Sequence, residues 1–432
     1  MADSSGMMNR RRVVVTGLGA VSPLGNDAAS TWRGFAAGVC GVGNITRFDT
    51  AAVPAKIAAE VKNFDPAEYI SRKEARRLSR FILYALASAR QAQADAALDM
   101  AVEDPTRIGV EIGSALGGLP IIEAQSVTLH QKGYRRINPT LIPATLVNMA
   151  ASFSSIDLHV LGPVSAPVAA CATGIVAIGQ AMRRIQWGEA DVMFAGAADS
   201  AITPIAVLGF HRLGALTARN DTPERAITPF DAKRDGTVLG EGAAVLVLES
   251  LSHAQTRGAK ILAEVTGYAT TADAFHVAAP APDADGATRA IVGAMRDADI
   301  SPAEIGYIAA HGTGTPLNDA AETRAIKRAC GDAAANIPIS SQKSMVGHTL
   351  GAAGALASLA AVQVLQTGTI PPTIGLHTPD PDCDLDYVPN VARQGDVQYA
   401  MANAFGFGGQ NAVIIFKKWQ PPDSFEKQEK IE

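Results

Sequence analysis

Short apolar runs recur along the chain, and several are followed by a longer segment whose apolar residues fall at helical spacing. The runs typical of buried strands lie at residues 12–16, 107–114, 164–170, 190–198, 243–248, 261–269, 305–310, 337–340, 399–403 and 412–416. The segments with helical spacing lie at residues 65–98, 172–187, 249–257, 287–298 and 351–366. This alternation predicts a layered α/β fold.

The pattern of strands and helices starts again near residue 259, which predicts two similar halves. We expect a loose extension at residues 1–10, one half at 11–258, a second at 259–418 and a polar tail at 419–432. Each half places its polar motifs directly after an apolar strand. Ligands of such folds bind at the carboxyl ends of the strands, so we expect ligands to bind at these motifs.

Composition narrows the class of protein. The chain has 432 residues, of which 47% are hydrophobic and 18% charged, so it is globular rather than disordered. A net charge of −5 argues against a nucleic-acid-binding protein. The four cysteines form no CxxC pair, which favours a reducing compartment over a disulfide framework. No apolar run suits a membrane span or a signal-peptide core, so a cytoplasmic protein is expected.

Cys171 stands where a small apolar strand is expected to turn into a helix. Unpaired N–H groups and the helix dipole at such a turn favour an anion, which predicts a lowered thiol pKa. Small neighbours such as Ala170 and Gly174 leave room for a substrate carbonyl. A lone cysteine in an apolar run is more often a buried hydrophobe, so the nucleophile interpretation depends on the rest of the chain.

Two histidines follow strands of the second half. His311 lies in AAHGTGTPLND, and His348 lies in KSMVGH, which begins with Lys343. Glu322 comes eleven residues after His311, and a glycine-rich GFGG segment follows the strand near residue 400. Each histidine alone could be a hydrogen-bonded core residue. A zinc site with Cys171 is the rival interpretation, although ligand pairs at short spacing are absent.

The first strand is followed by Gly17-x-Gly19-x-x-Ser22, which has the start of a dinucleotide-binding fingerprint. Its third glycine is missing, and Pro23 follows at once. We expect this segment to turn into a helix, with nucleotide binding as a minor alternative.

Together ACATG, AHGTGTPLND, KSMVGH and NAFGFGG resemble the motifs of the β-ketoacyl-acyl-carrier-protein synthases, in the same order and over nearly the whole chain. TPFDAKRDGTVLGEG and PDCDLDYVPN are similar to the type II condensing enzyme of fatty-acid synthesis. The resemblance implies a thiolase-like fold with two βαβ-rich halves in a layered α-β-α-β-α core. It also implies a homodimer that uses an acyl-carrier protein, with substrates carried on phosphopantetheine and no metal or dissociable cofactor.

The resemblance also implies a role for each motif. Cys171 would carry the acyl group, His311 and His348 would be the catalytic pair, and Lys343 with Glu322 would be a buried charged pair supporting them. Backbone N–H groups of Cys171 and Phe407 would form an oxyanion hole. The hydroxyls of Thr313 and Thr315 would bind pantetheine. The side chains that would line the acyl pocket are those of Leu116, Phe210 and Phe405.

A local run of positive charge on a net-negative chain predicts a docking surface for the acidic carrier protein. Its members are Arg72, Lys73, Arg76, Arg77, Arg135 and Arg136. The chain departs from the family at Ala169, where threonine is usual, at Ser114–Gly118, at Ala404, where serine is usual, and at Gly214, where many relatives carry arginine. Three alternatives remain open: a polyketide ketosynthase subunit, a non-catalytic scaffold subunit and a coenzyme A thiolase.

Overall fold

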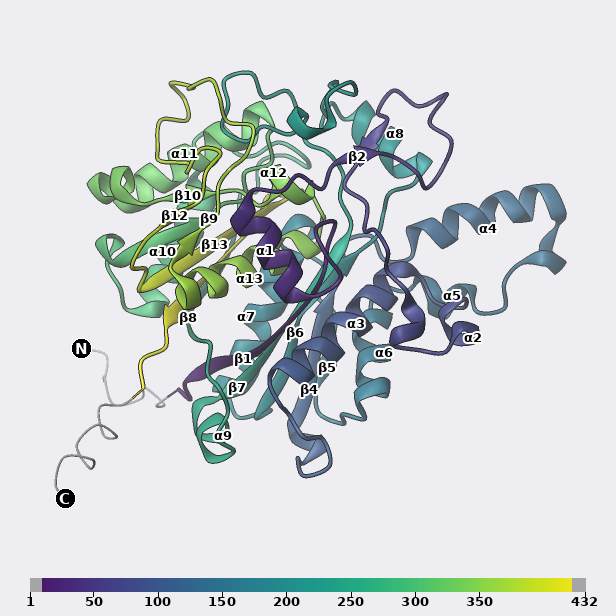
Figure 1. Cartoon of the computed structure of the whole chain (residues 1–432), viewed down its shortest axis with the longest axis horizontal. Helices are drawn as coiled ribbons and strands as arrows, with labels where there is room; N and C mark the ends of the chain where they lie inside the picture. Colours follow the sequence, from purple (N-terminus) through teal and green to yellow (C-terminus); the bar gives the residue numbers. More distant parts are fainter. Residues whose placement is uncertain (1–9, 422–432) are drawn as a thin grey trace.

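The computed structural model describes residues 10–421, and its centre is a twisted sheet that runs through the whole molecule (Figure 1). The predicted extension at 1–10 and tail at 419–432 fall almost entirely outside the described residues. The sheet contains β1 (Val13–Val21), β4 (Ile108–Gly113), β5 (Val164–Ser165), β6 (Val192–Asp199), β7 (Gly242–Ser250), β8 (Ala263–Ala272), β9 (Ile305–Ala309), β10 (Ile339–Ser340), β13 (Tyr399–Gly406) and β14 (Gln410–Lys418).

The helices that pack on this sheet or flank it range from 4 to 16 residues in length. They are α1 (Ala28–Ala37), α2 (Arg72–Ala75), α3 (Arg80–Asp95), α4 (Leu119–Lys132), α5 (Leu141–Thr145), α6 (Met149–Leu158), α7 (Thr173–Gln186), α8 (Pro204–Arg212), α9 (Leu251–Thr256), α10 (Asp285–Ala298), α11 (Pro316–Cys330), α12 (Lys343–Val346) and α13 (Ala352–Thr367). Two small sheets complete the fold, β2 (Gly43–Asn44) with β3 (Ile57–Ala58) and β11 (Thr369–Ile370) with β12 (Arg393–Gln394).

The sheet consists of two halves with the same internal order. Strands β1-β7-β6-β4-β5 form one half and β8-β14-β13-β9-β10 form the other. In each half the first three strands of that order are antiparallel and the last three are parallel. The halves meet where β1 pairs with β8, at three positions only. The expected pair of similar halves is therefore present in the topology.

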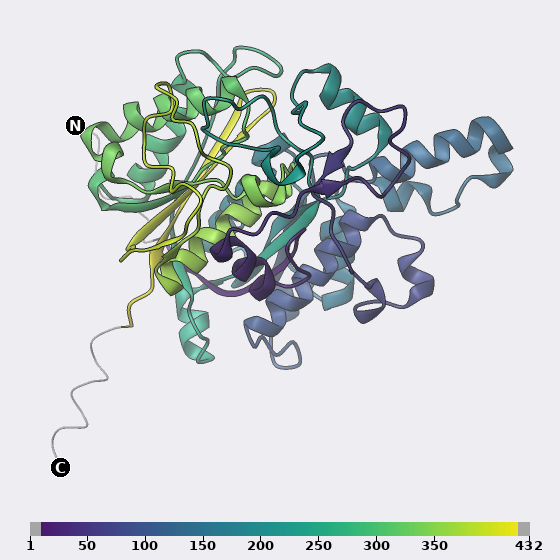
Figure 2. The ribbon, with the colours of Figure 1, turned by 45° about the horizontal axis from the view of Figure 1, so that its top comes forward.

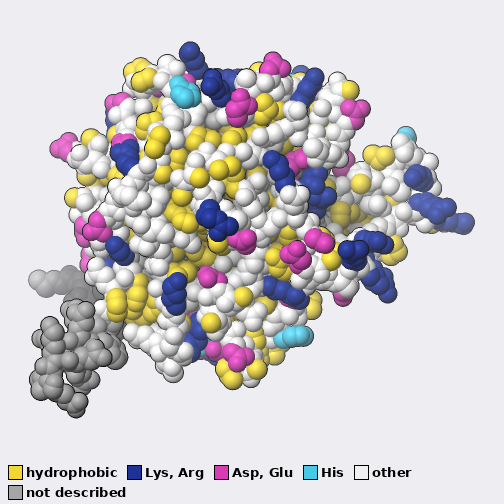
Figure 3. Space-filling view, in the orientation of Figure 1, with side chains coloured by type: hydrophobic (Ala, Val, Ile, Leu, Met, Phe, Trp, Pro, Cys, Tyr) yellow, Lys and Arg dark blue, Asp and Glu magenta, His cyan; other side chains and the backbone are white. Residues whose placement is uncertain are grey.

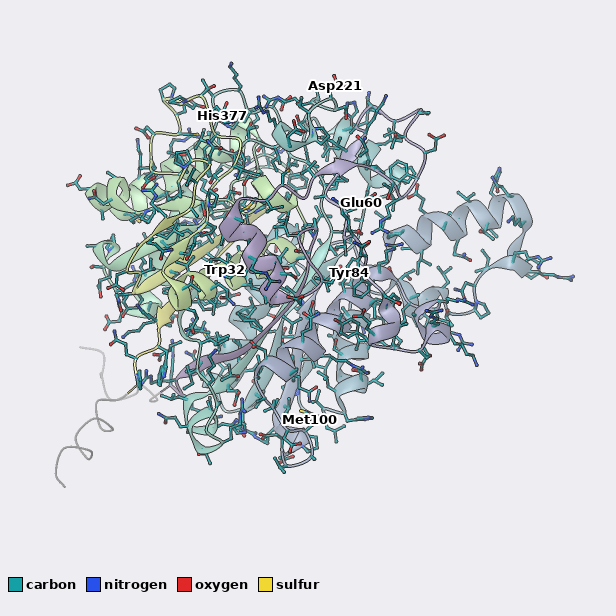
Figure 4. The ribbon with its side chains drawn as sticks, viewed as in Figure 1. Trp32, Glu60, Tyr84, Met100, Asp221 and His377 are labelled. Atoms are coloured by element: carbon teal, nitrogen blue, oxygen red, sulfur yellow. The ribbon has the colours of Figure 1, made fainter. Side chains whose placement is uncertain are left out.

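Helices lie in three layers around the two half-sheets. Helices α3 and α6 cover the outer face of the first half, and α10 and α11 cover the outer face of the second. Between the half-sheets α7 packs against α13, and α1, with Trp32, packs against this central core (Figure 4). The turned view in Figure 2 shows the same layers. These layers confirm the predicted α-β-α-β-α fold.

Apolar residues fill the spaces between the layers, which explains why the strand runs are apolar on both sides. On β14, Ile414 and Phe416 face the central core around α7 and α13, whereas Val413 and Ile415 face the core beneath α10 and α11. Helix α13 is buried around nearly its whole circumference, as expected for a helix enclosed by protein.

The structure corrects two predictions for the first half. Strand β1 continues through Gly17 and Gly19 to Val21 instead of turning into a helix. A Cβ at Gly19 would lie 1.9 Å from the Ser88 carbonyl oxygen on α3, so these glycines serve close packing of helix on strand. The dinucleotide interpretation is therefore wrong.

The second correction concerns the apolar run before Cys171. Only Val164 and Ser165 form a strand, and they pair with β4 at the outer edge of the sheet. Val164 and Val168 are 41% and 54% exposed, so this run is not the buried strand that was predicted.

Helix α4 extends away from the body of the molecule (Figures 1 and 2). None of its residues is buried, although Ile122, Val127 and Leu129 are apolar. No helix within residues 10–421 has both the length and the apolar character that crossing a membrane requires.

Candidate active site

Cys171 lies on a tight turn that leads from the edge strand into α7. Ala170, directly before it, has a φ of 48°, a left-handed conformation that costs a residue with a side chain about 1–2 kcal/mol. The Thr173 hydroxyl stabilises this turn because it donates to the Ala170 carbonyl at 2.7 Å and accepts from the Ala169 N–H at 2.9 Å. The turn brings the thiol to the first turn of the helical segment, as the sequence predicted.

His348 is the direct partner of Cys171. Its Nε2 lies 3.1 Å from Cys171 Sγ, and its Nδ1 accepts the Leu350 N–H at 3.1 Å. An imidazole nitrogen that accepts cannot carry the proton, so the neutral ring is protonated on Nε2. The ring therefore presents an N–H donor to the sulfur.

His311 follows β9 and completes the group, with its ring centroid 5.6 Å from that of His348. Its backbone is held from two sides. Lys343 Nζ donates to the His311 carbonyl, and the Glu322 carboxylate accepts the His311 N–H at 2.8 Å and the Gly312 N–H at 2.7 Å. Lys343 and Glu322 were expected to form a charged pair, but no ion pair within 4.0 Å joins them in the described part of the chain; they act on opposite sides of one peptide segment.

Burial dominates the electrostatics of the site. Burial, together with the charge of Lys343, lowers the pKa of both histidines well below the usual range, so both rings are neutral at pH 7. Burial also lowers the pKa of Lys343 to about 8 and raises that of Glu322 to about 7.

The thiol departs from expectation. Burial raises the pKa of Cys171 to about 11, although Lys343 and the N–H groups of Phe407 and Cys171 itself lower it. The predicted thiolate near neutral pH is therefore wrong for the unliganded site, because desolvation outweighs the helix N-terminus. The same two N–H groups converge beside the sulfur, as the predicted oxyanion hole requires.

A cavity of about 490 Å³ leads from the surface to Cys171, His311 and His348. The Phe405 ring lies 5.7 Å from the His311 ring, and the Phe407 ring stacks on Phe210 at 6.1 Å. Other residues that line the cavity are Leu213, Gly214, Thr237, His276, Thr313, Thr315, Leu317 and Glu322. A reactive thiol, two neutral N–H donors and a passage of this size suit acyl transfer and stabilisation of a developing oxyanion.

Comparison with known families agrees with this chemistry. The family model "Beta-ketoacyl synthase, N-terminal domain" matches residues 10–254, and "Beta-ketoacyl synthase, C-terminal domain" matches residues 262–377. The chain belongs to the β-ketoacyl synthase family. Members of this family are acyltransferases, so the predicted enzyme class is confirmed.

Individual relatives of this β-ketoacyl synthase cover almost its whole length. It is 47% identical over 96% of the chain to a protein named 3-oxoacyl-[acyl-carrier-protein] synthase 2 from Synechocystis sp., of which 99% is covered. Among solved structures, the ishigamide ketosynthase/chain length factor superposes with a TM-score of 0.89 and 37% identity. A second, AntDE:AntF, described as a type II PKS acyl-carrier protein in complex with its ketosynthase, superposes with a TM-score of 0.87 and 34% identity. Each superposition covers 95% of this chain and all of the other.

The two threonines predicted to bind pantetheine lie at the wall of the cavity. Their hydroxyls are 2.9 Å apart, and Thr315 caps the N-terminus of α11. Leu116, by contrast, does not line this cavity, and its side chain is 36% exposed. A role for Leu116 in the acyl pocket of the synthase stays a prediction.

The predicted docking residues are all exposed and lie at one end of the synthase. Arg72, Lys73, Arg76 and Arg77 belong to α2 and the turn after it, and Arg135 and Arg136 lie beyond the far end of α4. Figure 3 shows Lys and Arg side chains gathered over this end of the molecule. Their role in docking stays a prediction.

Three buried residues of the site were not found from the sequence. Asp319 accepts the N–H groups of Thr313 and Gly314, at 3.0 and 3.2 Å, and Asn403 donates to Glu322 at 3.3 Å. Asp199 ends β6 and accepts hydrogen bonds from the Ser114 hydroxyl and the Gly351 N–H. Asp319 closes the motif AHGTGTPLND, so its place in the first turn of α11 was a usable signal; nothing local marked Asp199.

Proposed function

We propose that this chain is a 3-oxoacyl-[acyl-carrier-protein] synthase, which lengthens an acyl group by two carbons through decarboxylative condensation with malonyl-acyl-carrier protein. The observation that carries the proposal is the contact of the protonated Nε2 of His348 with Cys171 Sγ, with the neutral His311 ring beside them. Near-full-length similarity to proteins of that name supports it.

The first half-reaction transfers the acyl group to the enzyme. The sulfur of Cys171 attacks the thioester carbonyl, the bond to the pantetheine sulfur breaks, and the proton of the thiol ends on that departing sulfur. The N–H groups of Cys171 and Phe407 and the charge of Lys343 stabilise the thiolate and the tetrahedral oxyanion. One oxyanion donor of this kind typically lowers the barrier by about 3 kcal/mol.

The second half-reaction needs donors rather than a base. As the carboxylate of the malonyl group leaves as carbon dioxide, its bonding electrons form an enolate on the thioester oxygen. Ring N–H groups of His311 and His348 donate to that oxygen, and burial keeps both rings neutral, with one N–H each. The enolate carbon then attacks the acyl carbonyl on Cys171. The bond to the sulfur breaks, and the thiolate takes up a proton from solvent.

The carrier arm would enter through the cavity and bond to Thr313 and Thr315, and no dissociable cofactor takes part. The six exposed basic residues named for docking would receive the acidic carrier protein. The AntDE:AntF structure holds a carrier protein with its ketosynthase, which supports a carrier as partner in this family. A cytoplasmic location stays a prediction.

We further propose that two copies pair through the outer edge of the first half-sheet. Strand β5 ends the sheet there, so one side of its backbone is unpaired. Val164 and Val168 are exposed at this edge, and Ile122, Val127 and Leu129 of α4 are exposed as well. We expect Val168→Asp to shift the protein from dimer to monomer in analytical ultracentrifugation, and a monomeric unmodified protein would contradict the pairing.

A ketosynthase of a polyketide pathway is the second candidate, because the AntDE:AntF structure is described as a type II PKS carrier protein with its ketosynthase. The chemistry at Cys171 is the same, and the products differ. A singly extended 3-oxoacyl chain supports fatty-acid synthesis, whereas repeated extension without reduction supports the alternative.

The proposal is tested with the full chain, malonyl-carrier protein and acyl-carrier proteins of several chain lengths. Mass spectrometry should find the acyl group on the peptide that contains Cys171 and a product two carbons longer. Cys171→Ala should abolish both, whereas Cys40→Ala, at a half-buried cysteine outside the cavity, should preserve them. Absence of the product from the unmodified protein, or its formation by Cys171→Ala, would contradict the proposal.

A further inference from the structure

Asp199 is a buried carboxylate that takes no direct part in the proposed reaction. It is the last residue of β6 and has no exposed surface. Burial raises its pKa to about 6, against hydrogen bonds that lower it, so the structure bears a cost to keep an acidic group there. A charged group retained at such a place calls for a specific role.

Four donors surround the carboxylate, and they come from two different loops. Ser114 Oγ and the Leu116 N–H donate to Oδ1 at 2.7 and 3.1 Å, and the Ala115 N–H donates to Oδ2 at 2.9 Å. These three donors belong to the loop after β4. The fourth is the Gly351 N–H, at 2.8 Å from Oδ2, in the turn that starts α13. Asp199 therefore joins a loop of the first half to a turn of the second.

The turn at Gly351 continues directly into the catalytic group. Leu350 donates its N–H to His348 Nδ1, and the Gly351 carbonyl accepts the Gly174 N–H at 3.0 Å, at the start of the helix that follows Cys171. A Cβ at Gly351 would lie 2.6 Å from Asp199 Oδ2, so this close approach needs a glycine. One short segment thus connects Asp199 to both His348 and the base of the Cys171 turn.

We propose that Asp199 is a positioning residue: its carboxylate holds the turn of Leu350 and Gly351 so that His348 keeps its Nε2–H directed at the reacting atoms. The inference rests on the proposed function of the site. Asp199 would thus control the orientation of the His348 ring without touching it. A displacement of about 1 Å in such a group can lower a rate about 10²-fold.

Asp199→Asn tests the proposal with almost no change of volume. An amide has one acceptor oxygen, so its NH₂ group must face either the Ala115 and Gly351 N–H groups or the donors of Ser114 and Leu116. Either orientation sets the NH₂ group against at least one backbone N–H. Loss of the negative charge also weakens the bonds that the remaining oxygen accepts, because charge-assisted hydrogen bonds are about twice as strong as neutral ones. Both effects loosen the link between the two loops.

The measurement compares two rates on the full chain: decarboxylation of malonyl-carrier protein, and single-turnover acylation of Cys171. Decarboxylation relies on the histidine donors, so Asp199→Asn should lower it about 10–100-fold while acylation changes at most about threefold. Ser114→Ala removes one donor of the other loop and keeps the Gly351 link, so it should change both rates by less than about threefold. Glu249→Gln, at a fully buried carboxylate on β7, is the control for general destabilisation and should leave the ratio of the rates unchanged.

Equal losses of both rates in folded Asp199→Asn, or no loss of either, would overturn the positioning role. Should that variant fail to fold, Asp199→Glu keeps both acceptor oxygens and displaces them by one methylene, and the same disproportion is expected. An unmodified protein that neither decarboxylates nor condenses would instead contradict the proposed function itself.

Discussion

Three influences on the thiol pKa compete at Cys171, and their balance could not be read from the sequence. The helix N-terminus and Lys343 favour the thiolate, whereas complete burial opposes it and raises the pKa to about 11. The motif predicted the position of the thiol correctly because a strand–turn–helix is a local feature. Burial depends on Phe407 and His348, which lie more than 170 residues away in the chain, and a local pattern carries no information on it.

The first prediction concerns the pH dependence of this thiol. At pH 7 only about one molecule in 10⁴ holds a thiolate when the pKa is near 11, so alkylation by iodoacetamide should rise steadily from pH 7 to 9 without a plateau. Lys343→Met removes a positive charge that lowers the thiol pKa, so the variant should react more slowly. Because the pKa of Lys343 is about 8, the difference should be larger at pH 7 than at pH 9.

The alkylation rates are measured by quenching the reaction at successive times and detecting the modified protein by mass spectrometry. Lys260→Met, at an exposed lysine, is the control. A plateau below pH 8 would show a thiol far more acidic than the burial implies. A ratio of rates that does not change with pH would remove Lys343 as the cause.

The second prediction separates the two histidines from the nucleophile. His311→Ala and His348→Ala should each lower malonyl decarboxylation about 10²–10⁴-fold, because each removes an N–H donor to the enolate. Acylation of Cys171 should fall less, since its oxyanion is held by backbone N–H groups. Single-turnover measurement of both steps checks this, and equal losses in both would refute separate roles.

Among the elements, central strands were predictable and edge strands were not. Strands β6 and β7 are buried on both faces, so their sequences are continuous apolar runs. The run at 164–170 is also apolar, although Val164 and Val168 are exposed at the edge of the sheet, and composition does not distinguish these two cases. Gly17 and Gly19 of β1 were wrongly predicted to end the strand. They lie inside it, where the backbone of α3 approaches closely, and the sequence does not distinguish such glycines from those of a turn.

The third prediction belongs to the junction of β7 and α9. Burial would raise the pKa of Glu249, but hydrogen bonds from Arg257, His253 and Thr16 lower it to about 2. His253 lies between Glu249, at 2.7 Å, and Glu103, at 2.9 Å, and the hydrogen bond to Glu249 is the main cause that raises its pKa.

A histidine whose folded-state pKa is raised stabilises the protein below its unfolded pKa of about 6.5, and that contribution is lost as pH rises through the folded value. His253→Gln should therefore lower Tm by about 1–2 °C more at pH 6 than at pH 9. Calorimetry across this range measures the difference, with His130→Gln on the exposed α4 as control. A larger effect at pH 9 would reverse the assigned sign.

At the scale of the whole molecule, charge is unevenly placed. The net charge is −5, yet α2 and the tip beyond α4 present exposed arginines and lysines (Figure 3). Charge-complementary docking accelerates encounter and is screened by salt over about 10 Å at 0.1 M. The sequence run predicted the residues, whereas their common position at one end of the molecule became visible only in the fold.

The fourth prediction follows from this placement. Arg76→Glu with Arg77→Glu should raise KM for the carrier-bound substrate about tenfold at low salt and only slightly at 0.5 M salt, with kcat unchanged. Arg296→Glu, an exposed arginine on α10, should have little effect at either ionic strength. A KM of the unmodified enzyme that is independent of salt would contradict electrostatic docking.

The shared strand order of the two halves has a meaning in evolutionary terms. Strands β5 and β10 occupy the same place in the two halves. Helix α7 comes after β5 in the chain and α13 comes after β10, so Cys171 and His348 precede equivalent helices. A duplicated ancestor that paired with itself would present two copies of one turn to each other across a twofold axis, and both copies would carry the same residue. Fusion into a single gene releases that constraint, because each copy can then mutate alone. Cys171 and His348 thus stand where an ancestral pair of identical side chains would have met.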